Sequence, residues 1–219
     1  MSKLFVVSAP SGTGKTTLNN RLMKEHPSVE IAVSHTTRNR RDGEQNGSSY
    51  HFVSKESFQS MAKNDEMLEW AEVFGNLYGT SKGELDRIFA KGHHVLLEID
   101  VQGCRSILSK KPDAVTVFIL PPSIEALWHR LERRGTDKLN ERWRRFLTAK
   151  HEIEAGNVYE HFIINDDVER AYKELKAVIV EGKHSSISHD AGIKFCEKLI
   201  EEFDSSPLLQ DLKKQFGGD

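Results

Sequence analysis

The sequence predicts an α/β fold in which helices flank a parallel sheet. Short apolar runs of strand length, such as Leu4 to Val7, alternate along the chain with stretches whose apolar residues recur at helical spacing. Continuous apolar runs are typical of parallel strands, because both faces of such a strand are buried. Polar or glycine-bearing segments follow these runs at 9–16, at Ser34 and at Asp100. We therefore expect the functional edge of the sheet to lie at the carboxyl ends of its strands.

The first strand leads directly into a turn suited to phosphate. Gly12 and Gly14 lack the side chains that would keep a polyphosphate away from the backbone, so successive N–H groups can approach its oxygens. Lys15 adds a positive charge for the β- and γ-phosphates, and the hydroxyl of Thr16 is a ligand type that Mg²⁺ takes beside them. The turn therefore predicts the binding of a nucleoside triphosphate.

This turn matches the P-loop pattern G-x-x-x-x-G-K-S/T except at its first position, where Ala9 replaces glycine. The replacement requires that residue 9 avoid the positive φ values that only glycine adopts cheaply. The predicted ATP-binding residues of the turn are Ala9, Pro10, Ser11, Gly12, Thr13, Gly14, Lys15, Thr16 and Thr17.

Length, charge and cysteine content limit the possible classes of protein. The 219 residues suffice for one well-packed domain with insertions, or for two small domains at most. A net charge of −2 provides no general attraction to nucleic acid or to an anionic membrane. No apolar run is long enough for a secretory segment or a membrane span, so we expect a cytoplasmic protein. Cys104 and Cys196 show no metal-binding spacing and are interpreted as free thiols.

The elements after the turn are predicted from periodicity and from the residues that cap or end them. Leu18, Leu22 and Met23 share one face of the helix after the turn, and Pro27 marks where it has ended. Ser123 can cap the helix that follows Pro121-Pro122. Further strands are expected at 29–33, 48–53, 95–100, 114–120 and 162–164, and helices at 55–63, 124–135, 139–155, 168–179 and 193–203.

Buried faces are predicted for several of these helices. We expect Phe58 and Met61 to face inward, and we expect Trp143 and Phe146 to do the same while the arginines beside them face outward. One face of the 168–179 helix is predicted to contain Val168, Tyr172, Leu175, Val178 and Ile179. The chain after Lys183 is interpreted as a helical appendage.

The region between the first helix and the Asp100 strand has the composition of a second binding site. Arg38 and Arg41 offer two planar guanidinium groups for a phosphate dianion, and Tyr50 and Tyr78 offer phenolic donors to the same group. The alternative is that these arginines lie on a solvated face.

Four further residues of this region fit guanine. Guanine displays an acceptor at O6 and donors at N1 and N2, and it therefore suits the hydroxyls of Ser34 and Thr80 together with the carboxylates of Glu69 and Asp100. Adenine would present an acceptor at N1 to a carboxylate. A site whose buried polar groups are left unpaired by the wrong base can discriminate by about 10⁴ or more.

Four motifs occur in the order found in guanylate kinases, and the chain from about Leu4 to Gly182 resembles the bacterial type of that family. They read Ser-Ala-Pro-Ser-Gly-Thr-Gly-Lys-Thr-Thr at 8–17, Ser-His-Thr-Thr-Arg-x-x-Arg-x-Gly-Glu at 34–44, Gly-Asn-Leu-Tyr-Gly-Thr-Ser at 75–81 and Ile-Asp-x-Gln-Gly at 99–103. The resemblance implies transfer of the γ-phosphoryl group of ATP to GMP or dGMP, with Mg²⁺. Glu98 departs from the more usual Asp, and Arg40 and Asp42 replace prolines.

The resemblance also implies roles for individual residues. Ser34, Glu69, Thr80 and Asp100 would bind guanine, and Arg38, Arg41, Tyr50 and Tyr78 its phosphate. A mobile lid would bring Arg130, Arg134 and Arg145 over the transferring phosphoryl group. Asn165 resembles the position that meets adenine. Mg²⁺ would bind Thr16, with Asp100 touching it directly, through water or not at all.

The implied organisation is a P-loop NTPase-type core with an inserted GMP-binding subdomain and a helical lid. The expected boundaries are 1–33, 83–122 and 156–183 for the core, 34–82 for the insert, 123–155 for the lid and 184–219 for a C-terminal helical extension. The expected partners are small-molecule nucleotides. Neither nucleic acid nor membrane is expected as a partner, and a homo-oligomer is compatible with the sequence.

Two other functions are alternatives to this one. A non-catalytic guanylate kinase-like module would bind phosphopeptides, but such modules generally lack the Gly14-Lys15-Thr16 sequence that is intact here. A nucleic-acid-binding protein would use the basic and aromatic run at 142–146, whose helical periodicity separates arginines from aromatic residues.

Overall fold

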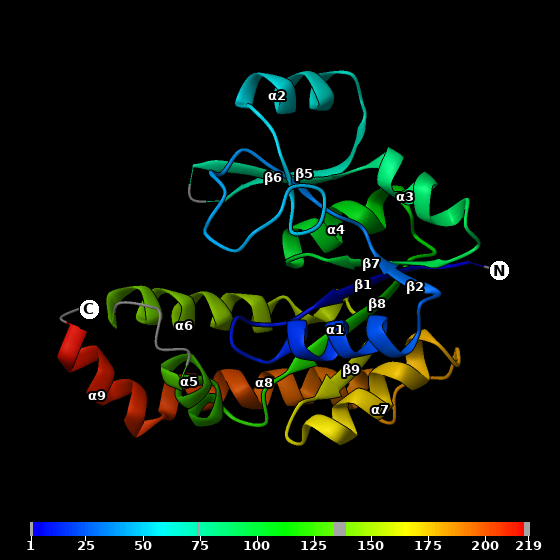
Figure 1. The fold of residues 1–219 in the computed structure, drawn as a ribbon. Coiled ribbons are helices and arrows are strands. Elements are labelled where there is room, and N and C mark those ends of the chain that lie inside the picture. Colours follow the sequence, from blue (N-terminus) through cyan, green and yellow to red (C-terminus); the bar gives the residue numbers. More distant parts are fainter. Residues whose placement is uncertain (1, 74, 134–138, 217–219) are drawn as a thin grey trace. The chain divides into compact units, whose positions relative to one another are not determined.

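The computed structural model describes residues 2–73, 75–133 and 139–216 (Figure 1). The chain divides into two compact units, each described separately below. Unit 1 comprises Met1–Val6 and His26–Val115, and unit 2 comprises Val7–Glu25 and Thr116–Asp219. The elements of the first unit, with β1 shared, are β1 (Leu4–Ser8), β2 (Val29–Ile31), β3 (His35–Thr36), β4 (His51–Phe52), α2 (Lys55–Lys63), β5 (Met67–Val73), β6 (Asn76–Ser81), α3 (Lys82–Phe89), β7 (His94–Glu98) and α4 (Val101–Lys110).

Unit 2 is mainly helical. Its elements are α1 (Lys15–Glu25), β8 (Val115–Leu120), α5 (Ile124–Arg133), α6 (Leu139–Glu154), the 3₁₀ turn η1 (Gly156–Val158), β9 (His161–Ile164), α7 (Val168–Ile179), α8 (His189–Ser205) and α9 (Pro207–Phe216). The five-stranded sheet has the order β2-β7-β1-β8-β9, with β2 parallel to β7 and β8 parallel to β9. The predicted α/β class with a parallel sheet is confirmed. Every residue of β1 is buried, as its apolar sequence predicts.

Unit 1 contains a second sheet, of order β4-β3-β6-β5, built on an antiparallel hairpin of β5 and β6. Phe58 of α2 packs with Met67 and Leu77 beneath this hairpin, and Met61 lies at the edge of the same cluster. The predicted inward face of α2 is therefore confirmed.

Two short helices of unit 1, α3 and α4, were not among the predicted elements. Each begins after a residue whose side chain caps it. Ser81 Oγ accepts the backbone N–H of Glu84 at 3.3 Å, and Asp100 Oδ1 accepts that of Gly103 at 2.8 Å. The strand predicted to end at Asp100 ends at Glu98 instead, because the carboxylate of Asp100 caps α4.

An aromatic cluster forms the core of the helical part of unit 2. The ring of Phe146 lies 5.3 Å from that of Trp128 and 4.9 Å from that of Phe203, so α5, α6 and α8 meet there. Trp143 also contacts Trp128, as its predicted inward orientation requires. The prediction that Arg142 faces outward is wrong. Its side chain is only 17 % exposed and its guanidinium lies 5.8 Å above the Trp128 ring.

Helix α8 contributes to this core and also packs against β9. Cys196, Leu199 and Phe203 are buried on it. A Cβ atom at Gly192 would lie 2.2 Å from the Phe162 ring, so α8 approaches the strand more closely than a side chain would permit. Val168, in contrast, is 45 % exposed, although it was predicted to share the buried face of α7. The predicted functional boundaries, including an extension at 184–219, stay predictions.

Both cysteines are buried free thiols, as expected. Within the described residues, no helix combines the length and apolar character that crossing a membrane demands.

Truncating Phe203 tests whether α8 is part of the core. Since this ring is fully buried against Phe146, Phe203→Ala is expected to lower the free energy of unfolding by about 3–5 kcal/mol. The measurement is urea denaturation, with Glu201→Ala on an exposed position of the same helix as the control. A loss below about 1 kcal/mol would show that α8 packs only peripherally.

Candidate active site

The turn after β1 forms a pocket in unit 2, here named the loop pocket. It has a volume of ≈ 240 Å³, and its lining consists of Ala9, Pro10, Ser11, Gly12, Thr13, Gly14, Lys15, Thr16 and Glu152. Helix α1 begins at Lys15, and the first turn of any helix carries N–H groups without intrahelical partners. The pocket therefore lies where backbone N–H groups and the positive end of a helix dipole favour an anion.

Both glycines of the turn are required by its geometry. Gly12 and Gly14 have φ values of +92° and +104°. A Cβ atom at Gly12 would lie 2.8 Å from Leu131 Cδ2, and one at Gly14 would lie 2.6 Å from Asn165 Nδ2. Ala9, by contrast, has no positive φ, so the alanine at the first P-loop position fits without backbone strain.

Two side chains fix the turn through one backbone oxygen. Asn165 Nδ2 donates to Thr13 O at 2.7 Å, and Arg130 donates to the same oxygen at 3.0 Å and to Asn165 O at 2.7 Å. Asn165 is buried, and its Oδ1 atom has no hydrogen-bond partner within the described part of the chain. Burial lowers the pKa of Arg130 below its ordinary value. Arg130 and Asn165 thus both contact the loop pocket's backbone.

Of the two other predicted lid arginines, the structure describes Arg145. Arg145 lies on α6, and its guanidinium is 3.7 Å from the carboxylate of Glu141. Arg134 falls outside the described residues.

A second pocket, here named the hairpin pocket, lies in unit 1. Its volume is ≈ 200 Å³ and its lining consists of Ser34, Tyr50, Glu69, Ala71, Val73, Tyr78, Gly79, Glu98, Ile99 and Asp100. Five of the eight residues predicted to bind GMP therefore line a single pocket. Thr80 adjoins it, with its Oγ1 atom 3.4 Å from the hydroxyl of Ser34.

Glu69 is the buried carboxylate of this pocket. It pairs with Thr80 across the hairpin, and only 5 % of it is exposed. Burial raises the pKa of its carboxyl above the ordinary value of 4.5, and the nearby Asp100 raises it further, while hydrogen bonds from Thr80 oppose the shift. A carboxylate held at this cost is suited to receive N–H donors from a ligand.

Of the predicted phosphate-binding side chains, Tyr50 and Tyr78 line the hairpin pocket and Arg38 lies beside Tyr50. Arg38 donates to Glu44 at 2.6 Å and lies 5.5 Å from the Tyr50 ring centre. The rings of Tyr50 and Tyr78 are 6.0 Å apart, and hydrogen bonding to Glu44 raises the pKa of Arg38. The side chain of Arg41 is exposed, while its backbone N–H donates to Glu44 at 2.8 Å. Glu44 therefore anchors the segment that carries both arginines.

Sequence reasoning did not assign Gly79 or Glu98 to the pocket. A Cβ atom at Gly79 would lie 2.5 Å from Glu69 O, so a side chain there would push β6 away from β5. A glycine inside a strand often signals such close approach, which was the available indication. The sequence marks Glu98 only as a departure from the family pattern, and the structure places it in the lining of the hairpin pocket.

Comparisons with known proteins agree with these features. The family model described as guanylate kinase matches residues 1–182. The guanylate kinase of Neisseria meningitidis serogroup A is 48 % identical over 176 residues, which cover 80 % of this chain and 86 % of that relative. The guanylate kinase of Symbiobacterium thermophilum is 42 % identical over 199 residues, covering 91 % and 93 %.

A solved structure is also similar. The crystal structure of guanylate kinase from Anaplasma phagocytophilum aligns with a TM-score of 0.66 and 29 % identity, covering 100 % of this chain and 97 % of the other. The chain therefore belongs to the guanylate kinase family of nucleoside monophosphate kinases.

Proposed function

We propose that this protein transfers the γ-phosphoryl group of ATP to GMP or dGMP, with Mg²⁺, and releases ADP and GDP or dGDP. The observation that carries the proposal is the buried carboxylate of Glu69 in the same pocket as a serine hydroxyl, two further carboxylates and two tyrosines. This donor and acceptor set matches the edge of guanine and leaves adenine poorly paired.

The loop pocket is the proposed site for the phosphates of ATP. Backbone N–H groups at 11–17 would surround the phosphate oxygens, and Lys15 would reach the β- and γ-phosphates. The unpartnered Oδ1 of Asn165 is an acceptor for the amino group of adenine. Adenine, unlike guanine, offers such a donor at N6.

The hairpin pocket is the proposed site for GMP. Glu69 and Asp100 would accept from N1–H and the 2-amino group, and the Ser34 and Thr80 hydroxyls, 3.4 Å apart, would donate to O6 and its surroundings. Arg38, Arg41, Tyr50 and Tyr78 would bind the phosphate. Since Arg38 is paired with Glu44, the phosphate would share that guanidinium rather than meet an unpaired one.

Mg²⁺ fits the donor set of the loop pocket, because a threonine hydroxyl directly follows the lysine at the start of α1. Thr16 would hold the ion, and Mg²⁺ would neutralise charge on the phosphates. Asp100 keeps a second carboxylate oxygen beyond the one that caps α4, so it can accept from guanine or from a water on the metal.

The chemical step needs charge neutralisation more than a base. A phosphate oxygen of GMP attacks the γ-phosphorus as the bond to the β-phosphate oxygen of ATP breaks, and ADP leaves. Lys15, Arg130, Arg134 and Arg145 are the proposed catalytic cations. Arg130 donates hydrogen bonds to the backbone oxygens of Thr13 and Asn165, so it also holds the loop in place.

The phosphopeptide-binding alternative has less support. It would need only the hairpin pocket, and it leaves the loop glycines, the lysine and the buried Asn165 contact without a purpose.

Nucleotide selectivity tests the assignment of the hairpin pocket. ADP release is expected with GMP or dGMP and little with AMP, CMP or UMP. Glu69→Gln should lower kcat/KM for GMP by about 10- to 100-fold, since a charged hydrogen bond contributes about 1.5–3 kcal/mol. Glu72→Gln, an exposed position on the same strand, is the control. A preference for AMP would refute the base assignment.

Removing the loop lysine tests the ATP assignment. Lys15→Ala is expected to lower kcat by about 10²-fold or more, because one preorganised cation at the transferring group contributes several kcal/mol. Lys24→Ala, at the exposed end of the same helix, should leave the rate unchanged. Equal turnover by the two variants would reject the role of Lys15.

The burial of Glu69 predicts a pH dependence of stability without ligand. Its folded pKa is raised, so folding gains nothing from this group below about 4.5 and loses stability as pH rises from 4.5 through the folded pKa. Glu69→Gln removes that loss, and its stability relative to the parent chain should improve between pH 4 and pH 7. Urea denaturation at several pH values measures this, with Glu72→Gln controlling for lost charge on the same strand. A constant difference across pH would contradict the burial cost.

A further inference from the structure

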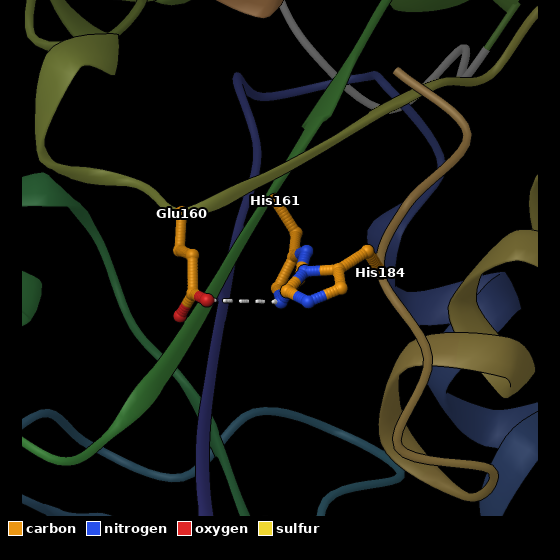
Figure 2. Close-up of side chains that lie close together, drawn as sticks. All are labelled: Glu160, His161 and His184. Atoms are coloured by element: carbon orange, nitrogen blue, oxygen red, sulfur yellow. Dashed lines mark ion pairs between the residues drawn. The ribbon is translucent and has the colours of Figure 1, made fainter. Parts of the chain in front are cut away.

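A cluster of metal-ligand side chains lies in unit 2 apart from the loop pocket. Figure 2 shows the side chains of Glu160, His161 and His184 directed toward one another. Each offers one ligand atom, and these three atoms lie within 4.8 Å of one another. We propose that these three residues form a binding site for a divalent transition metal ion such as Zn²⁺.

The ring of His161, the middle ligand, is held at the nitrogen that faces away from Glu160. Its side chain is 6 % exposed at the start of β9, and its Nε2 atom lies 3.7 Å from Glu160 Oε1. Ser185 places its backbone N–H 3.3 Å and its hydroxyl oxygen 3.4 Å from the other ring nitrogen, Nδ1. The ring is therefore held with Nε2 toward Glu160 and His184.

In the structure the backbone N–H of Ser185 donates to Nδ1 of His161. Metal binding at Nε2 would place the proton of a neutral ring on Nδ1 instead. The Ser185 hydroxyl donates to Ile187 O at 2.9 Å, so its oxygen, 3.4 Å from Nδ1, can then accept that hydrogen in place of the bond from the backbone N–H. A histidine ligand whose second nitrogen donates to a neighbouring group is the usual arrangement at metal sites.

The segment carrying His184 is anchored to the same strand. Ile187 forms an antiparallel bridge with Phe162, and the backbone N–H of Ser186 donates to Glu174 at 2.9 Å. The imidazoles of His161 and His184 have ring centres 5.6 Å apart. Since Glu160 and His184 are exposed, small side-chain rotations would bring both ligands to bonding distance around one ion.

The chemistry of the three ligands indicates the class of ion. Two imidazole nitrogens and one carboxylate oxygen suit Zn²⁺, Co²⁺ or Ni²⁺, whereas Mg²⁺ and Ca²⁺ prefer oxygen. The neighbouring cation Lys183 is paired with Glu181 at 2.8 Å, which reduces its repulsion of an ion.

The proposed metal site lies apart from the loop pocket. His161 begins β9, and Asn165, which contacts Thr13 of the loop pocket, follows its end. The two residues are four positions apart along an extended strand, which corresponds to about 13 Å. A bound ion would tie the segment between α7 and α8 to β9, and it would stabilise unit 2 without touching nucleotide.

Calorimetric titration of the full chain with Zn²⁺ tests the proposal. We expect one ion per chain and a rise in Tm of about 5 °C or more when Zn²⁺ is present at about a hundred times its Kd. His184→Ala and Glu160→Gln are exposed substitutions that leave the fold intact, and each should weaken binding by about 10-fold or more. His151→Ala removes an exposed imidazole from α6 and should bind as the parent chain does.

Two results would overturn the proposal. One is the absence of Zn²⁺ binding up to about 1 mM, and the other is equal binding by His184→Ala and the parent chain. GMP phosphorylation in Mg²⁺ separates this test from that of the proposed function. His184→Ala is expected to turn over as the parent chain does, and a loss of turnover would contradict a site that lies apart from nucleotide.

Discussion

The backbone oxygen of Thr13 receives N–H groups from both Arg130 and Asn165, and the shape of the loop pocket depends on this contact. The contact joins the turn after β1 to the end of α5 and to the end of β9. It also explains the glycine at position 14, since a Cβ atom there would collide with Asn165. A loop fixed in this way would bind the phosphates of ATP without rearranging. Phosphoryl transfer depends on such preorganised groups.

In unit 1, the burial of Glu69 lowers the stability of the unliganded protein. Burial raises the pKa of this carboxyl, so the unliganded protein is less stable than it would be with a neutral side chain at that position. In the proposed GMP site, the same burial would make the carboxylate selective, because a base that offers no N–H group would leave it unpaired. The stability lost by burying Glu69 would then be the physical origin of the proposed base selectivity.

The sequence predicted the elements whose signals are local. Continuous apolar runs predicted the parallel strands, and the glycines and lysine after β1 predicted the loop pocket. Side-chain partners set by packing were not predictable. Arg142 was expected in solvent, but Trp128 comes from another helix and covers its guanidinium. Asp100 was interpreted as a strand end, because a capping carboxylate and a binding carboxylate have the same signature. His161 and His184 are brought together only by the fold.

The central claim is that one nucleotide binds in each pocket, ATP through the loop pocket and GMP through the hairpin pocket. A crystal structure with GMP and a non-hydrolysable ATP analogue tests this most directly. The account predicts guanine against Glu69 and Ser34, and the triphosphate against the backbone of Gly12 to Thr16. Guanine bound elsewhere, or phosphates placed away from Lys15, would contradict it.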